Sequence, residues 1–132
     1  MQIIERFGRQ TVDSGTEWEP VMGYSRAVRA GNMIVVTGTV GILPDGTYPP
    51  TVREQTRQSL EIIRQSIESL GGTLQQIFRT RIFTTDISQW REIAAVHGEL
   101  FKDIRPATTL VEVRRLIDDR ALLEIEAEAL VK

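Results

Sequence analysis

The stretch LLEIEAEALV, Leu122 to Val131, alternates apolar and acidic residues. Side chains of a β-strand point alternately to the two faces of its sheet, so each residue type takes one face. The apolar face holds Leu123, Ile125, Ala127, Ala129 and Val131. The acidic face holds Glu124, Glu126 and Glu128. We therefore expect a strand with one side in a hydrophobic core.

Two further stretches predict strands of the same sheet. Ile77 to Asp86 places Phe78 and Ile82 on one face and Arg79, Arg81 and Phe83 on the other. Thr108 to Arg114 is the third candidate. The side with the charges must meet water or another subunit, and a buried charge there would need a partner. The periodicity alone leaves a solvated face and a subunit interface equally open.

Helical spacing predicts two helices. The first begins with a capping box of Thr51 and Glu54 and ends at Gly71-Gly72. Its apolar positions are Val52, Leu60, Ile63, Ile67 and Leu70. The second begins after Ser88, ends near Lys102 and carries Trp90, Ile93, His97 and Leu100 on one side. Two helices can cover only one face of the sheet, which indicates an α+β fold.

The rest of the chain reads as turns and loops. Val28 to Thr37 predicts a hairpin, because Ala30-Gly31-Asn32 tolerates positive φ between two β-prone runs. Asp13 to Met22 and Leu43 to Pro50 predict loops.

Composition limits the class of protein. With 132 residues, 41% of them hydrophobic, the chain is expected to form one domain, residues 1–132. Sixteen basic and eighteen acidic residues give a net charge of -2, which disfavours a nucleic-acid or membrane partner. The opening MQIIERFGRQ has no apolar run typical of a signal peptide, and we expect a cytoplasmic protein.

Few residues suit catalysis. The chain has no cysteine, and its one histidine, His97, lies on the apolar stripe of the second helix, which favours a structural role. Neither a zinc site nor a histidine pair for RNA cleavage can be assembled from these residues. The glycine-containing VTGTVG, Val36 to Gly41, lacks the lysine and spacing of a phosphate loop.

The run RPATTLVEV, Arg105 to Val113, together with LLEIEAEALV, resembles the C-terminal signature of the RidA family (YjgF/YER057c/UK114). That family carries Pro-Ala-Arg-Ser in the first run and Glu-Ile-Glu-Ala in the second. The resemblance extends through Tyr24 to Gly41, Glu54 to Gly72 and Arg79 to Trp90. About the first twenty residues match no part of the pattern.

The resemblance implies a homotrimer of chorismate-mutase-like α+β subunits. Each subunit would have a mixed, mainly antiparallel sheet with two helices on one face. The clefts of the trimer would lie between neighbouring subunits. It implies deamination of a small imine or enamine without cofactor or metal, with Tyr24 and Glu124 lining the cleft and Gly38 positioning the ligand. Two alternatives remain. For Glu124 the alternative to a cleft residue is a structural ion pair with Arg79, Arg81 or Arg114. For Tyr24 the alternative is packing at a subunit boundary.

The sequence departs from the family at Thr108, where the family's arginine grips the substrate carboxylate. An arginine-carboxylate pair contributes about 1.5 to 3 kcal/mol, so we expect binding of such a ligand to be about tenfold to a hundredfold weaker. Arg105 or Arg26 would compensate if either is more than a surface charge. Trp18 and Glu19 would cover the cleft mouth or pack on the surface.

The leading hypothesis is therefore a trimer that binds a small metabolite and hydrolyses an imine or related compound, with an altered substrate preference. The alternative is a catalytically silent binding or regulatory trimer. The endoribonuclease activity attributed to some family members is disfavoured by the charge and residue inventory.

Overall fold

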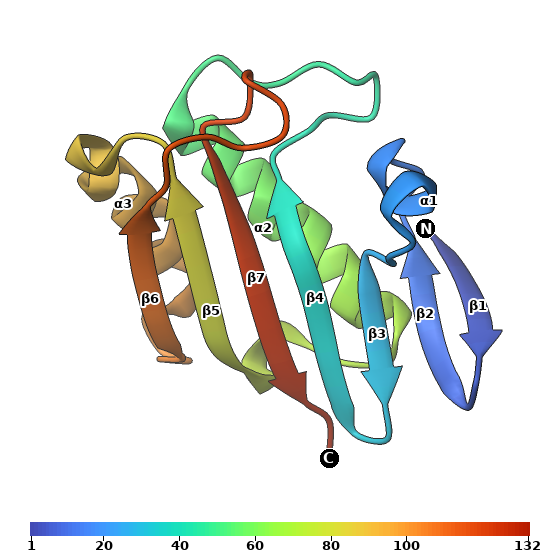
Figure 1. Ribbon diagram of the computed structural model, residues 1–132. Coiled ribbons are helices and arrows are strands. Elements are labelled where there is room, and N and C mark those ends of the chain that lie inside the picture. The colour runs from blue at the N-terminus through green and yellow to red at the C-terminus, as the bar shows by residue number, and fades with distance from the viewer.

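The computed structural model describes residues 1–132, which form one seven-stranded sheet and three α-helices (Figure 1). The strands are β1 (Gln2–Arg6), β2 (Arg9–Asp13), β3 (Ala27–Ala30), β4 (Met33–Val40), β5 (Ile77–Thr84), β6 (Ala107–Glu112) and β7 (Leu123–Leu130). The helices are α1 (Trp18–Met22), α2 (Val52–Ser69) and α3 (Trp90–Phe101), with 3-10 turns at Leu74–Gln76 and Ile87–Gln89. No helix is long and apolar enough to cross a membrane.

The sheet has the strand order β1-β2-β3-β4-β7-β5-β6. All neighbours are antiparallel except β5 and β6, which are parallel. Parallel strands need a crossover connection, and α3 supplies it. This arrangement is the mixed, mainly antiparallel sheet expected of the α+β fold.

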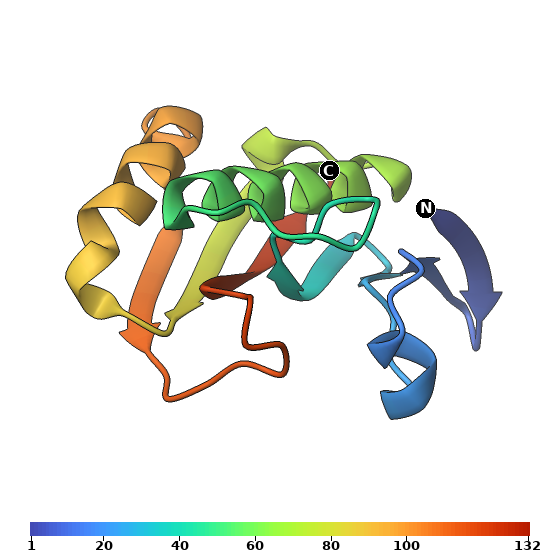
Figure 2. The same ribbon diagram turned by 90° about the horizontal axis from the view of Figure 1, so that it is seen from above.

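Strand β7 lies inside the sheet between β4 and β5, with its two faces divided as predicted. The predicted apolar face, Leu123, Ile125, Ala127, Ala129 and the following Val131, is at most 8% exposed and joins the core cluster. Helices α2 and α3 cover this face, whereas the short α1 lies on the other side of the sheet (Figure 2). The side of the sheet that α2 and α3 leave uncovered is called the open face below.

Helix α2 follows the sequence prediction closely. The Thr51 side chain accepts a hydrogen bond from the Glu54 backbone N–H at 3.2 Å, which caps the first turn. All five predicted apolar positions are no more than 3% exposed. The capping box therefore predicted the start of this helix, and the apolar spacing predicted its buried side.

Two predicted faces are wrong in part. A register shift between Ile77 and Arg79 turns Phe78 out to 41% exposure and puts Ile77 in the core. A bulge inserts one residue into the alternation, so the residues before it change face. In α3, Ile93 is fully buried as expected, but Trp90 is 42% exposed and stacks on Arg91.

The N-terminal segment is more ordered than the sequence indicated. Strands β1 and β2 form a hairpin at the sheet edge, and α1 occupies part of the predicted loop Asp13 to Met22. Phe7 and Gly8 turn the hairpin with φ of 51° and 78°. Two positive φ values in a two-residue loop are typical of a type I′ turn, which favours asparagine at the first position.

Phe7→Asn is expected to stabilise the protein by about 0.5 to 1 kcal/mol, because it relieves a left-handed backbone at a residue that hardly packs. Phe7 is 96% exposed, so little apolar contact is lost. Urea denaturation measures the effect. Phe7→Ala is the matched control, since alanine removes the ring but keeps a residue poorly suited to this turn. An unchanged or lower midpoint for the asparagine variant would contradict the strain argument.

Candidate functional site

Glu124 lies on the open face beside Gly38. The register of β4 shifts between Val36 and Thr39, so Gly38 falls in an irregular part of the strand opposite β7. A Cβ atom at Gly38 would lie 2.9 Å from Glu124 Oε1 and 3.1 Å from Oε2. The carboxylate therefore rests against backbone that only glycine leaves open.

The Glu124 carboxylate has no hydrogen-bond or ion-pair partner in the structure. Burial raises its pKa, and the negative charge of Glu126 raises it further, while Arg26 opposes the shift. Arg81 pairs instead with Glu126 at 3.4 Å and Glu128 at 3.1 Å. Within one chain, then, the ion-pair alternative for Glu124 is not realised. A carboxyl group with a raised pKa and no partner is suited to accept or donate a proton.

Arg26 is buried behind Gly38, with 4% exposure. Its Nη1 donates to the Gly38 carbonyl at 2.8 Å and to Thr39 Oγ1 at 3.2 Å, and its Nε donates to Ser14 Oγ at 3.1 Å. Its Nη2 lies 3.6 Å from Glu19 Oε2. Arg26 is thus not a surface charge, and its donors hold the irregular part of β4 in place.

Glu19, which is 4% exposed, is the counter-charge of Arg26. Its carboxylate accepts the backbone N–H groups of Ser14 at 2.9 Å and Thr16 at 3.0 Å, and both hydroxyls. Burial alone would raise its pKa, but these hydrogen bonds outweigh burial and lower it. Glu19 therefore does not lie on the surface, because it is buried and joins the β2-α1 loop to β4 through Arg26.

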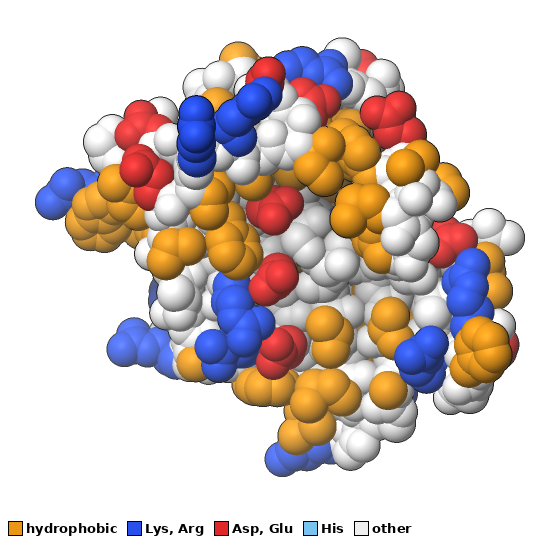
Figure 3. All heavy atoms as spheres, viewed as in Figure 1, with side chains coloured by type: hydrophobic (Ala, Val, Ile, Leu, Met, Phe, Trp, Pro, Cys, Tyr) orange, Lys and Arg blue, Asp and Glu red, His pale blue; other side chains and the backbone are white.

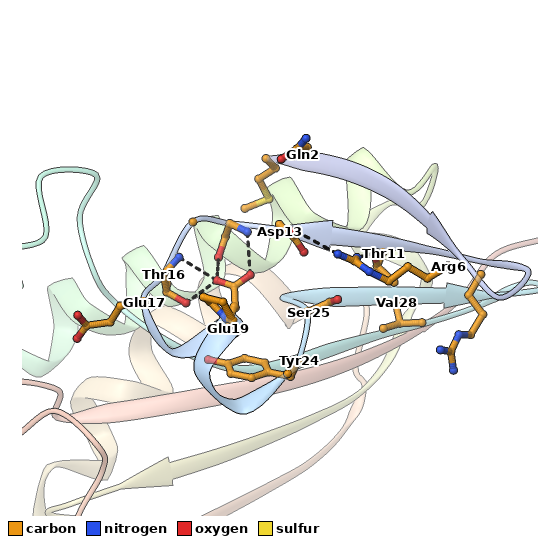
Figure 4. Close-up of a pocket in the computed structure, with 16 residues that line it drawn as sticks. Gln2, Arg6, Thr11, Asp13, Thr16, Glu17, Glu19, Tyr24, Ser25 and Val28 are labelled. Atoms are coloured by element: carbon orange, nitrogen blue, oxygen red, sulfur yellow. Dashed lines mark hydrogen bonds and ion pairs between the residues drawn. The ribbon is translucent and has the colours of Figure 1, made fainter.

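Tyr24 borders a hollow of about 1110 Å³ between α1 and the first three strands (Figure 4). The centre of its ring lies 5.7 Å from the Arg26 guanidinium carbon. Both residues precede β3, which starts at Ala27. Trp18 lines a second cavity, of about 520 Å³, together with Arg26 and Thr39.

Thr108 lies on the edge strand β6, opposite Thr80 of β5. Its hydroxyl is 2.8 Å from Thr80 Oγ1, and Thr80 points into the buried side of the sheet with 1% exposure. Glu124 pairs with Phe83 and points to the open face. One chain therefore does not bring Thr108 and Glu124 together, since they lie on opposite faces and at different positions along β5.

Arg105 precedes β6 with a left-handed φ of 60°. Its backbone N–H bonds the Phe101 carbonyl at 2.8 Å, which closes the end of α3. The side chain is exposed and forms no ion pair. Of the two arginines considered as replacements for the family's cation, only Arg105 has an uncommitted guanidinium.

Comparison with known proteins identifies the family. The Endoribonuclease L-PSP family model matches residues 15–131. The chain belongs to the RidA family, also called YjgF/YER057c/UK114. The match starts at Gly15, so the family pattern begins earlier than the sequence analysis indicated. The β1-β2 hairpin lies outside the matched residues.

Several relatives illustrate the RidA family. The 2-iminobutanoate/2-iminopropanoate deaminase of Escherichia coli is 34% identical over 110 residues, covering 80% of this chain and 85% of that protein. Rv2704 of Mycobacterium tuberculosis has a similar structure with a TM-score of 0.87 and 46% identity, covering 93% and 99% of the chains. The Escherichia coli TdcF structure with bound serine has a TM-score of 0.80 and 27% identity, covering both chains completely. The family thus includes imine deaminases.

Sequence reasoning proposed Glu124, Gly38, Tyr24 and Thr108 as site residues and did not foresee the Glu19-Arg26 pair. The usable signal was Arg26 itself, a charged residue where the family's motif has glutamine. The structure also contains no cluster of three or more histidine, aspartate or glutamate side chains that could hold a metal ion.

Proposed function

We propose that this RidA-family chain forms a cytoplasmic homotrimer that binds a small metabolite in clefts between subunits and hydrolyses an imine or enamine. The observation that carries the proposal is Glu124, an unpartnered carboxylate with a raised pKa held against Gly38. No cofactor or metal is required, since water is the only second reactant.

The open face supports assembly through the sheet. Figure 3 shows acidic side chains in a row on this face, basic ones beside them and hydrophobic ones around them. Several large apolar side chains of β4, β5, β6 and β7 are exposed; they include Met33, Val35, Phe78, Val111 and Leu130. Exposed apolar side chains grouped with matched charges are typical of subunit interfaces.

Charge pairing also favours burial of this face. Arg81 already pairs with Glu126 and Glu128 within the chain, so part of the charge on this face is matched before a neighbouring copy covers it. The Arg79 Nε is buried without a hydrogen-bond partner. The Arg79 guanidinium also forms no ion pair within the chain, so a carboxylate of a neighbouring copy would find it unpaired.

A composite site follows from the placement of Thr108. Because Thr108 and Glu124 lie apart in one chain, a ligand that touches both would lie between two copies. Glu124 and Tyr24 would come from one subunit and Thr108, with Arg105 nearby, from the next. The serine bound by TdcF and the substrates named for the Escherichia coli deaminase are ligands of the size such a cleft would take.

The chemistry assigned to Glu124 is activation of water. Its carboxylate would accept a proton from water as the oxygen attacks the C=N carbon, and would then return that proton to the departing amine. The hydroxyl of the resulting carbinolamine supplies the second proton that the nitrogen needs. The C–N bond breaks as the carbonyl forms, which yields a keto compound and ammonia. Tyr24 and the Gly38 backbone would position the ligand.

Thr108 favours a second candidate function, a binding or regulatory trimer without turnover. Threonine offers a neutral hydroxyl where the family's deaminating members offer a guanidinium, and it cannot grip a carboxylate bidentately. The two functions share the same cleft and differ only in whether a bound imine is hydrolysed.

The deciding experiment incubates the purified protein with enzymatically generated 2-aminoacrylate and follows pyruvate release, with light scattering on the same sample. The proposal expects a mass near three times 14.9 kDa and release faster than in protein-free controls. A trimer that releases pyruvate at the uncatalysed rate would favour the silent function. A stable monomer would refute the proposed clefts altogether.

Thr108→Arg is expected to raise pyruvate release from 2-aminoacrylate by about tenfold to a hundredfold, because it restores a charge-assisted grip on the carboxylate. Steady-state kinetics measure the change. Thr108→Gln is the matched control, as it adds length and hydrogen-bonding groups without charge. Equal rates for the two variants would show that the missing cation does not limit this reaction.

A further inference from the structure

Hydrogen bonds connect α3 to the edge of the sheet through one buried hydroxyl. His97 Nε2 lies 3.0 Å from Thr80 Oγ1, which in turn lies 2.8 Å from Thr108 Oγ1. Thr80 is 1% exposed, His97 is half-buried and Thr108 is exposed. The only histidine of the chain is therefore linked to a surface hydroxyl through Thr80. These three residues are called the His97 chain below.

Packing alone does not explain a threonine at position 80. Valine has nearly the same shape, and burying a hydroxyl is favourable only when it is hydrogen-bonded. The Thr80 hydroxyl has two partners, His97 and Thr108, and both come from other elements. The polar contacts thus unite α3, β5 and β6 at this point of the sheet.

The His97 chain can run in two directions. Thr108 can donate to Thr80 and Thr80 to His97, which leaves Thr108 to accept a hydrogen bond from a ligand. In the reverse direction His97 donates to Thr80 and Thr80 to Thr108. Thr108 then donates to the ligand in place of the Pro106 carbonyl, which lies 3.3 Å from its hydroxyl in the free chain. A neutral imidazole permits both directions, because either ring nitrogen can carry the proton. A protonated imidazole permits only the second.

We propose that His97, acting through Thr80, is a positioning residue that decides whether the Thr108 hydroxyl donates to or accepts from a bound ligand. This proposal rests on the proposed function, in which Thr108 lines the cleft. It assigns the ligand a carbonyl or carboxylate oxygen at Thr108 that is held most tightly when His97 is protonated. A ligand amine at the same place is held by the neutral form.

The surroundings of His97 suit this role. The Phe101 ring centre lies 4.5 Å from the imidazole centre. Burial lowers the His97 pKa, and the one side-chain hydrogen-bond partner of the imidazole is the uncharged Thr80. An acceptor bound at Thr108 would stabilise the protonated imidazole, and by linkage its binding would tighten as the pH falls.

The first experiment needs no ligand. Long-range ¹H–¹⁵N NMR follows the tautomer and titration of His97 in the wild type, Thr108→Val, Thr80→Val and the double variant. If the His97 chain is continuous, Thr108→Val should shift the tautomer equilibrium of His97, although Thr108 does not contact the imidazole ring. In the Thr80→Val background, Thr108→Val should leave the His97 tautomer equilibrium unchanged. The proposal would be overturned if Thr108→Val left the His97 tautomer unchanged in the wild type, or if it shifted the tautomer equally in the wild type and in Thr80→Val.

The second experiment measures binding of 2-oxobutanoate, a stable keto analogue of an imino acid, by calorimetry between about pH 5 and 8. The wild type should bind about threefold to tenfold more tightly as His97 becomes protonated, in excess of any change in Thr80→Val. Thr80→Val keeps both Glu124 and His97. The difference between the two pH profiles therefore measures the effect of the hydrogen bonds that run through the Thr80 hydroxyl. Thr80→Ser, which restores the hydroxyl, should restore the wild-type profile.

The outcomes separate the two proposals. Binding with identical pH profiles in the wild type and Thr80→Val would overturn the role of His97 and leave the proposed function intact. No binding of 2-oxobutanoate by any variant, Thr108→Arg included, would overturn the proposed function and this role together. His97→Gln, which can donate and accept but does not titrate, should bind with the weaker pH dependence of Thr80→Val.

Discussion

Glu19→Gln is expected to lower the free energy of unfolding by about 3 to 5 kcal/mol, because it leaves the Arg26 guanidinium charged and buried without its counter-charge. The two side chains are 5% and 4% exposed, so water cannot replace the lost carboxylate. Glutamine also weakens the hydrogen bonds from Ser14 and Thr16, which now reach a neutral acceptor. Urea denaturation at neutral pH measures the change.

Two controls test that explanation. Glu17→Gln, two residues away and exposed, should change stability by less than about 0.5 kcal/mol. Adding Arg26→Met to Glu19→Gln should recover part of the loss, since no unpaired charge then remains. A single variant as stable as the wild type would refute the importance of this pair.

The Glu19 effect should also depend on pH. The folded state lowers the Glu19 pKa below its ordinary value of 4.5, so the unfolded chain binds a proton there more readily. The stabilisation by Glu19 is therefore complete above that ordinary value and is lost as the pH falls through the lower, folded value. Glu19→Gln should lack this part of the acid sensitivity.

Glu124→Gln is expected to lower the rate of imine hydrolysis by about 10²- to 10⁴-fold, because the amide cannot accept a proton from water. The rate of the wild type should fall at acid pH as the carboxylate is protonated. This fall should occur above the ordinary glutamate range, since burial and Glu126 raise the Glu124 pKa. Single-turnover and steady-state kinetics across pH measure both effects.

Stability distinguishes a catalytic role of Glu124 from a structural one. A raised pKa means that the ionised carboxylate is less favourable in the folded than in the unfolded chain at neutral pH. Glu124→Gln should therefore leave the free energy of unfolding unchanged or raise it. Glu5→Gln, an exposed carboxylate on β1, is the control for activity. A variant that keeps full activity would remove Glu124 from the mechanism.

The sequence predicted those parts of the fold where a single periodicity runs unbroken. The alternation in β7 and the helical spacing in α2 each bury one face, and both predictions are confirmed. Prediction failed where one residue interrupts the pattern. The bulge near Phe78 reverses a face without any change of composition, and the exposure of Trp90 depends on where α3 meets its neighbours.

The candidate site shows the same division. The motifs predicted Glu124, Tyr24, Gly38 and Thr108 as individual residues, and the structure adds that Glu124 has no partner while Arg26 has four. The partners of Arg26 come from other elements, Glu19 from α1 through an ion pair and Gly38 from β4 through a hydrogen bond. Local sequence patterns carry no information about them.

By itself, the sequence determined the family, the α+β class and the division of β7 into an apolar and an acidic face, because these follow from residue order within one element. Only the tertiary structure decided that Thr108 and Glu124 point to opposite sides of the sheet and that His97 meets Thr108 through Thr80. The physical reason is that strand register and helix packing set these relations, and both arise from contacts between elements far apart in the chain.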